Sequence, residues 1–283
     1  MNPKYILDIG NFAIGHLYKN KMFIGTFPDG MGYRFALVAA ILHTPCRYLT
    51  AIGNEPLWQK ALAPLAKNNC KPKHLIKCNA SLEFDWLYDS HNLSPRIKIR
   101  NSSVMQKIAL STPPIKPIDT KAVFLGSLGL EYEKIILSQI APSIPVAYVF
   151  HETNLKNASA TAYLNLFKKI NYLFLNENEA SLLIPKTSYL QAGAVLSKLS
   201  QAVFLTRGAR GVAVFQHGTL YKKFPAISTS VVDPSGAGDI FASTTSIGLF
   251  THDNIDLAVI SGLTFASIKL GGYLTTSLQK FID

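Results

Sequence analysis

The chain has 283 residues, of which 48% are hydrophobic and 16% charged, and its formal net charge is +11. This length supports a substantial core in one large domain or two, and the apolar content excludes a chain that is disordered throughout. Most of the excess positive charge lies in residues 60–121, scattered singly among apolar and proline residues, so we expect a solvated basic face and no nucleic-acid partner; an anionic small molecule is the functional alternative.

Apolar segments of strand length alternate with stretches of helical periodicity along most of the chain. The expected strands are 5–9, 47–52, 122–125, 146–150, 172–175 and 203–206. The expected helices are 35–42, 57–66, 132–140, 161–170 and 179–199, the last broken near Pro185. This alternation predicts an α/β fold with a mostly parallel sheet that is covered by helices on both faces.

Two segments depart from the alternation. Residues 17–28 and 80–110 read as strands, and we expect them to form a small β-layer that projects from the main domain. The C-terminal part predicts a hairpin followed by two helices, at 211–215 with 219–224, 237–250 and 254–270. Because no linker or repeat divides the chain, we expect a single domain over 1–283.

The cysteines and the N-terminus favour a cytoplasmic protein. Cys46, Cys70 and Cys78 are odd in number and widely spaced, which fits neither a disulfide framework nor a zinc site. The N-terminal segment is too short in apolar residues for a signal peptide, and no stretch reaches the roughly 18–20 apolar residues that span a bilayer. We therefore expect no membrane partner.

The most informative segment is VVDPSGAGDIF, from Val231 to Phe241. Two glycines around an alanine let backbone N–H groups converge at a helix N-terminus, which makes an anion site suited to phosphate. The carboxylate of Asp239 beside such a site is explained if it removes a proton from a hydroxyl that attacks the phosphorus. The structural alternative is a turn in which Asp239 only caps the following helix.

This segment resembles the second signature of the ribokinase-like (PfkB) carbohydrate kinases, which runs roughly D-T-T-G-A-G-D-x-F. The matching residues are Asp233, Gly236, Ala237, Gly238, Asp239 and Phe241, while Pro234 and Ser235 stand in place of the two threonines. The resemblance implies that Asp239 is the catalytic base and that the backbone of the Gly-Ala-Gly sequence holds the transferring phosphate.

The resemblance also implies an architecture and a reaction. The fold would be the ribokinase-like three-layer α/β/α arrangement, with the small β-layer as a lid over the acceptor. The reaction would move the γ-phosphate of ATP to a hydroxyl of a sugar or sugar-like molecule, with Mg²⁺ as the metal. A monovalent cation such as K⁺ beside Asp233 and Ser235, and a homodimer formed through the lid, are further options that it leaves open.

Two motifs in the nucleotide half follow predicted strands. Asn176 and Glu179 face the same side of a helix start and are placed to hold waters of Mg²⁺, although a helix cap alone explains them too. Family members have an N-x-x-E motif at this place that is tied to Mg·ATP. Thr206, Gly208 and Gly211 match the T-x-G-x-x-G turn that flanks the nucleotide in the family, and their plain interpretation is a strand-to-strand turn.

The acceptor half departs from the family pattern. Gly30 and Gly32 are kept, but Asp29 replaces a hinge glycine, Arg34 replaces a sugar-contacting asparagine, and Gly15 replaces a sugar-binding aspartate. Because a guanidinium prefers carboxylate or phosphate, we expect an acceptor that carries an anionic group. The expected acceptor-binding residues are Asn11, Asp29, Gly30, Gly32 and Arg34.

Other functions remain open at this point. The altered acceptor half suggests a catalytically impaired relative that binds nucleotide or sugar as a regulator, and a nucleoside kinase of the same family is a second alternative. A nucleic-acid binder is motivated by charge alone. The sequence contains neither a Walker A loop nor a nucleophile elbow, which leaves the P-loop and hydrolase classes without support.

Overall fold

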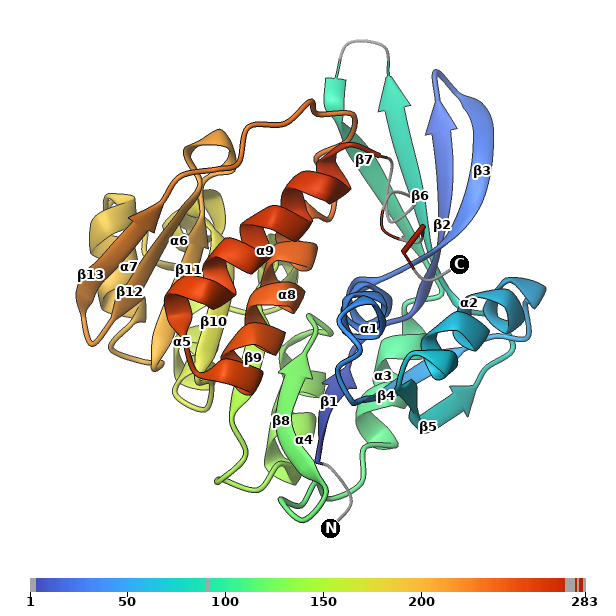
Figure 1. Cartoon of the computed structure of the whole chain (residues 1–283), viewed down its shortest axis with the longest axis horizontal. Helices are drawn as coiled ribbons and strands as arrows, with labels where there is room; N and C mark the ends of the chain where they lie inside the picture. Colours follow the sequence, from blue (N-terminus) through green and yellow to red (C-terminus); the bar gives the residue numbers. More distant parts are fainter. Residues whose placement is uncertain (1–3, 90–91, 273–277, 279, 282–283) are drawn as a thin grey trace.

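A computed structural model describes residues 4–89, 92–272, 278 and 280–281 (Figure 1). In this part of the chain a nine-stranded sheet has the order β13-β12-β11-β10-β9-β8-β1-β4-β5. Its strands are β1 (Tyr5–Ile9), β4 (Cys46–Ile52), β5 (Cys70–Lys77), β8 (Thr120–Leu125), β9 (Val146–Val149), β10 (Tyr172–Asn176), β11 (Ala202–Thr206), β12 (Val212–Gln216) and β13 (Thr219–Phe224).

The pairing of these strands confirms the predicted mostly parallel sheet. β1 pairs in parallel with β4 and β8, and parallel pairing continues outward to β5 and to β11. β12 and β13 are antiparallel and form the predicted hairpin. Central strands such as YILDI and AVFLT are nearly continuous in apolar residues because both of their faces are buried.

Helices cover both faces of the large sheet, which gives the three-layer α/β/α arrangement. One face is covered by α1 (Met31–Ile41), α2 (Pro56–Lys67), α8 (Ala237–His252) and α9 (Ile255–Leu270), in front of the sheet in Figure 1. The other is covered by α3 (Ser103–Leu110), α4 (Leu130–Gln139), α5 (Ala160–Phe167), α6 (Glu177–Leu183) and α7 (Tyr189–Leu196). Each face has its own apolar core.

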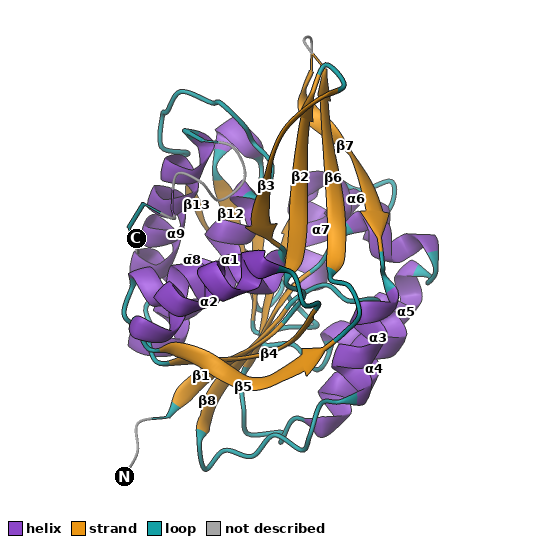
Figure 2. Cartoon of the chain, turned by 90° about the vertical axis from the view of Figure 1, so that its right-hand side faces the viewer, coloured by secondary structure: helices purple, strands orange, loops and turns teal. Residues whose placement is uncertain are grey.

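A four-stranded sheet projects from one end of the large one (Figure 2). Its order is β3-β2-β6-β7, with bounds β2 (Ala13–Lys19), β3 (Met22–Asp29), β6 (Leu82–Asp89) and β7 (Asn92–Arg100). The prediction of a small β-layer is confirmed, but it was wrong beyond β7, because α3 is a helix. Val104 and Ile108 of α3 are spaced four residues apart and bury one helical face, a period that the predicted strand lacks. Residues 90 and 91 of the predicted layer lie outside the described residues.

The structure differs from the prediction in two further details. α1 begins at Met31, four residues before the expected start, because Gly30 has φ +100° and turns the chain directly into the helix. β5 was not predicted, since this edge strand exposes Lys71, Lys73 and His74 and has no continuous apolar run.

The three cysteines, Cys46, Cys70 and Cys78, are buried free thiols. Among the helices of the described ranges, none combines the length and the apolar character that crossing a membrane requires.

Candidate active site

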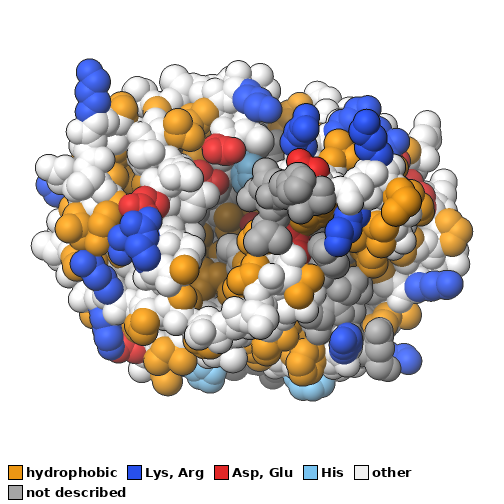
Figure 3. All heavy atoms as spheres, turned by 90° about the horizontal axis from the view of Figure 1, so that it is seen from above, with side chains coloured by type: hydrophobic (Ala, Val, Ile, Leu, Met, Phe, Trp, Pro, Cys, Tyr) orange, Lys and Arg blue, Asp and Glu red, His pale blue; other side chains and the backbone are white. Residues whose placement is uncertain are grey.

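The candidate site lies where parallel strands end and helices begin, the edge at which α/β sheets bind ligands. Asn11 follows β1, Asn176 ends β10 and Thr206 ends β11, and the first turn of α8 begins at Ala237. Seen from above, the surface is hollowed near its middle, between the side that carries β11 to β13 and the side that carries the four-stranded sheet (Figure 3). Acidic side chains lie at the edge of this hollow.

The turn from Gly236 to Asp239, here called the Gly-Ala-Gly corner, is open to solvent. Gly236 has φ +74° and precedes α8, Ala237 is half-buried, and Gly238 is exposed. The side chain of Asp239 is 18% exposed. A Cβ atom built on Gly238 would meet no other atom within 4 Å. Because the first N–H groups of a helix lack partners within the helix, this exposed turn is a candidate site for an anion.

Arg34 reaches this corner from α1. Its Nη2 atom lies 2.6 Å from Oδ1 of Asp29, and its Nη1 atom donates to Oδ2 of Asp239. The guanidinium lies 5.8 Å from the ring centre of Trp86, and a Cβ on Gly236 would lie 2.6 Å from its Cζ atom. Glycine at position 236 therefore makes room for Arg34. Sequence reasoning had expected a guanidinium open to an anionic acceptor, but here it already bridges two carboxylates.

Asp29 is fully buried in this structure, and its contact with an acceptor stays a prediction. Its Oδ2 atom accepts a hydrogen bond from Nε1 of Trp86 at 2.8 Å, and Oδ1 faces Arg34. Burial raises the pKa of Asp29, and the neighbouring guanidinium opposes that rise. In this conformation Asp29 holds Arg34 in place and is not accessible to a ligand.

Asn11 and the two glycines hold α1 against the end of β1. Oδ1 of Asn11 accepts from the N–H of Met31 at 2.9 Å, and its carbonyl oxygen accepts from the N–H of Gly32 at 3.0 Å. A Cβ on Gly32 would lie 2.8 Å from the carbonyl carbon of Gly10, so the close approach of helix and strand requires glycine there. A Cβ on Gly30 would collide with the backbone of Asn11. Their contact with an acceptor stays a prediction.

Asn176 and Glu179 form a capping box at the start of α6, the structural alternative that the sequence had left open. Oδ1 of Asn176 accepts from the N–H of Glu179 at 2.9 Å, and Oε2 of Glu179 accepts from the N–H of Asn176 at 2.7 Å. The N–H of Glu152 donates to Oε1 of Glu179 at 3.3 Å. No group of three or more His, Cys, Asp or Glu side chains could hold a metal directly among the described residues. Because a carboxylate oxygen has more than one lone pair, Glu179 can keep these hydrogen bonds and also accept one from a water of Mg²⁺.

Burial and the charge of Asp239 are among the causes that set the ionisation of Glu179. Burial, the largest cause, raises the pKa of Glu179 from 4.5 to about 7, and the negative charges of Asp239 and Glu152 contribute to the rise. Between these two values the folded protein keeps a proton that the unfolded chain has released. The contribution of Glu179 to stability therefore falls as the pH rises through this window.

Glu179→Gln is expected to remove this loss. Relative to the parent, the variant should gain up to about 3 kcal/mol in the free energy of unfolding between pH 5 and pH 8. Urea unfolding at pH 5, 6, 7 and 8 measures the difference, and Glu177→Gln in the same helix is the control. Parallel stability curves for parent and Glu179→Gln would contradict the assignment.

The T-x-G-x-x-G turn connects β11 to β12 through a short 3₁₀ helix, Gly208–Arg210. Gly208 has φ +56° and open space around its Cα, so its backbone is available to a ligand. Gly211 has φ +79°, and a side chain there would collide with the carbonyl group of Phe224, which makes its role structural. The hydroxyl of Thr206 lies 3.5 Å from the carbonyl oxygen of Leu175.

The two arginines of this turn face α6 and α7. Arg210 pairs with Glu177, and Nε of Arg207 lies 3.5 Å from the same carboxylate. The guanidinium of Arg207 also lies 3.8 Å from the ring centre of Tyr189. Glu177, Tyr189 and Arg210 line a cavity of 460 Å³ beside these helices. Both arginines are thus engaged away from the Gly-Ala-Gly corner.

The carboxylate of Asp233, beside which a monovalent cation was expected, already pairs with Lys269. The ammonium of Lys269 lies 2.9 Å from both Oδ2 and the backbone oxygen of Asp233, and both groups are fully buried. Oδ1 of Asp233 accepts from the hydroxyl of Tyr88 at 2.6 Å and from the N–H of Ser235 at 2.8 Å. A second cation about 4 Å from the ammonium would be repelled by about 4 kcal/mol at an effective dielectric constant of 20. The ammonium of Lys269 therefore already pairs with the carboxylate beside which K⁺ was expected.

Three residues of this corner were missed by sequence reasoning: Trp86, Tyr88 and Lys269. Trp86 and Tyr88 lie two apart on β6 and therefore point to the same face of the small sheet, a signal that the alternating pattern carried. The signal for Lys269 was a single lysine at the end of the long apolar segment that forms α9.

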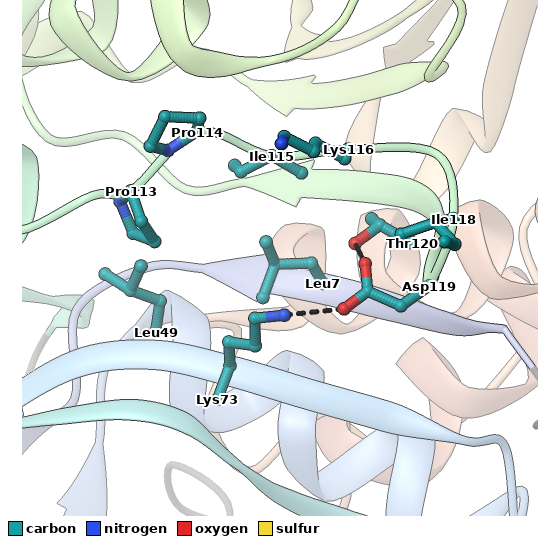
Figure 4. Close-up of a pocket in the computed structure, with 10 residues that line it drawn as sticks. All are labelled: Leu7, Leu49, Lys73, Pro113, Pro114, Ile115, Lys116, Ile118, Asp119 and Thr120. Atoms are coloured by element: carbon teal, nitrogen blue, oxygen red, sulfur yellow. Dashed lines mark hydrogen bonds and ion pairs between the residues drawn. The ribbon is translucent and has the colours of Figure 1, made fainter.

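A separate cavity of 170 Å³ lies at the opposite end of the large sheet (Figure 4). It is lined by Leu7, Leu49, prolines 113 and 114, and an ion pair of 2.7 Å between Lys73 and Asp119. Asp119 precedes β8 directly, so this cavity is at the amino-terminal edge of the strands and takes no part in the candidate site.

Comparison with known proteins gives one family and one fold. The model of the pfkB family of carbohydrate kinases matches residues 134–280, just over half of the chain. A ribokinase of Lactococcus lactis is 33% identical over 150 residues, which cover 46% of this chain and 48% of that protein. The chain thus matches about half the length of this curated relative.

Solved structures match over nearly the whole chain. An Escherichia coli protein provisionally named ribokinase II, solved with ATP and Mg²⁺, has a TM-score of 0.81 at 14% identity, with 99% of each chain covered. A nucleoside kinase of Burkholderia thailandensis, solved with inosine, has a TM-score of 0.78 at 15% identity, with 98% of this chain and 93% of that chain covered. The fold is therefore that of the ribokinases.

Proposed function

Since the chain belongs to the pfkB family of carbohydrate kinases, we propose that it transfers the γ-phosphoryl group of ATP to a hydroxyl of a sugar-like acceptor. The observation that carries this proposal is the open Gly-Ala-Gly corner at the start of α8, with Asp239 in the same turn. Backbone N–H groups fixed at a helix N-terminus stabilise the negative charge of a transferring phosphoryl group, because they are oriented before the reaction begins.

Asp239 is the base of the proposed reaction. It accepts the proton of the acceptor hydroxyl as the oxygen attacks the phosphorus, and the phosphoryl group leaves ADP. Asn176 and Glu179 are proposed to hold waters of Mg²⁺, which when bound neutralises charge on the phosphates. Thr206 and Gly208 are proposed to flank the nucleotide. The ATP and Mg²⁺ bound by the E. coli protein of the same fold support the use of this nucleotide and this metal.

The acceptor is proposed to carry an anionic group. Such a group would take the place of Asp239 as partner of Nη1 of Arg34, and Asp239 would then be free to receive a proton. The four-stranded sheet is proposed to cover the acceptor, because Trp86 and Tyr88 of β6 already reach Asp29 and Asp233. A nucleoside is the alternative acceptor, and the nucleoside kinase of B. thailandensis that shares this fold supports it.

A binding protein without turnover is the second candidate function. The ion pair between Arg34 and Asp239 favours it, because Oδ2 of Asp239 already accepts from the guanidinium and is not free to receive a proton from an acceptor hydroxyl. Label transfer from γ-labelled ATP to neutral sugars, phosphorylated sugars and nucleosides separates the two candidates. Nucleotide binding without transfer to any of them would support the binding protein.

Gly238→Ala tests the anion site without disturbing the fold. Open space surrounds this glycine, and alanine favours a helix by about 1 kcal/mol over glycine, so the variant should be at least as stable as the parent. Its methyl group would enter the space proposed for the phosphoryl group, and we expect kcat to fall by about 10²-fold, as for the loss of one oxyanion donor.

Thermal unfolding and initial rates of label transfer are the two measurements for Gly238→Ala. The matched control is Gly248→Ala, in the interior of the same helix. Its Cβ would crowd Ala258 of α9, so this variant changes stability without adding an atom at the anion site. Full activity of Gly238→Ala would contradict the placement of the phosphoryl group.

A further inference from the structure

Lys269 connects α9 to the chain that leads into the Gly-Ala-Gly corner. Its side chain is fully buried, and its ammonium donates at 2.9 Å to the carbonyl oxygen and to Oδ2 of Asp233. The backbone reinforces this link, since the N–H groups of Val232 and Asp233 donate to the carbonyl oxygen of Leu270 at 2.8 and 3.3 Å. Lys269 therefore fixes the turn that begins at Asp233.

The oxygens around the ammonium are those that bind hard cations. A backbone carbonyl and a carboxylate converge on one point, as they do around alkali and alkaline-earth ions in proteins. The other carboxylate oxygen of Asp233 is held by Tyr88 and by the N–H of Ser235, so the carboxylate cannot turn away. A positive charge at this point is thus required by a buried, fixed Asp233.

We propose that Lys269 is the resident cation of this corner, a covalently tethered ammonium that takes the place of a dissociable monovalent ion and fixes the turn from Asp233 to Ser235 in front of α8. Burial lowers the pKa of Lys269, and Asp233 opposes that change. The assignment goes beyond the proposed function and does not depend on turnover, since it concerns the folded protein without substrate.

We therefore expect the stability of the folded protein to be the same whichever monovalent cation is in solution. The melting temperature of the parent chain should agree within about 1 °C in KCl, NaCl and choline chloride at equal ionic strength, because Lys269 already fills the cation position beside Asp233. A melting temperature that is higher in KCl or NaCl than in choline chloride would overturn the proposal.

Lys269→Ala is expected to create a site for a monovalent cation beside Asp233. The change leaves Asp233 buried without its ammonium and opens space beside it, so the melting temperature should fall in choline chloride. K⁺ or Na⁺ entering this space should restore about 3–5 °C of the loss. Equal melting temperatures in all three salts would overturn the proposal. If the variant does not fold in choline chloride, circular dichroism measures its folded fraction in each salt. A larger folded fraction in KCl or NaCl would support the proposal, and equal fractions would overturn it.

Two controls separate this effect from general salt screening. Lys222→Ala removes an exposed lysine that pairs with Asp256, and it should respond equally to the three salts. Lys269→Met combined with Asp233→Asn removes both charges of this ion pair. The stability of the double variant should be no higher in K⁺ or Na⁺ than in choline. A preference as large as that of Lys269→Ala in either control would contradict the assignment. Because all readouts are stabilities, a chain without phosphotransferase activity still tests it.

Discussion

Replacing Asp239 by asparagine is expected to lower kcat of phosphoryl transfer by about 10²- to 10⁴-fold, the usual contribution of a general base. Asparagine has nearly the same shape, and its carbonyl oxygen still accepts from Arg34, but it cannot take the proton from the acceptor hydroxyl. The fold should survive, because the side chain is partly exposed and Arg34 keeps its pairing with Asp29.

Two measurements make this result specific to the chemical step. The affinity for ATP, measured by calorimetry, should change less than about threefold, since Asp239 does not contribute to ground-state binding in this account. Asp256→Asn, at an exposed carboxylate paired with Lys222, is the control and should keep the parent rate. Full activity of Asp239→Asn would show that another group receives the proton.

Replacing Arg34 by alanine is expected to have two large effects. The first is a loss of about 3–5 kcal/mol in the free energy of unfolding, because the fully buried carboxylate of Asp29 loses its counter-ion. The second is an increase of about 10-fold or more in KM for acceptors that carry a carboxylate or a phosphate, with a smaller effect on neutral acceptors.

A double variant separates these two effects. Arg34→Ala with Asp29→Asn removes the unpaired charge, so most of the stability should return while the selective increase in KM remains. Arg47→Ala, which removes a half-buried arginine stacked on Tyr5 outside the site, is the matched control for KM. An equal KM for anionic and neutral acceptors in parent and variant would show that Arg34 serves stability alone.

The layers of the fold could be predicted from the sequence because its parallel strands are buried on both faces. Segments such as Tyr172–Asn176 are apolar without interruption, and polar turns with capping residues separate them from the helices. β5 and α3 were missed for the opposite reason. The first is an exposed edge strand, and the second is a short helix next to an alternating segment, where the local pattern resembled a strand.

The helix that begins in the Gly-Ala-Gly sequence was predictable, because its start signal lies within one segment of the sequence. The contacts made by the charged side chains around it were not predictable. The partners of Arg34 and Lys269 come from residues 5 to 205 positions away along the chain, and only the three-dimensional packing of α1, α8 and α9 brings them together. A single sequence contains no information on such pairings.

The most direct measurement of the central claim is the transfer of label from γ-labelled ATP by the parent protein in the presence of Mg²⁺ and a panel of neutral, phosphorylated and carboxylated sugars and nucleosides. We expect label on a hydroxyl of at least one acceptor, most rapidly on an anionic one, and transfer slowed by about 10²-fold or more in Gly238→Ala and Asp239→Asn. Nucleotide bound at the Gly-Ala-Gly corner with no label on any acceptor would contradict it.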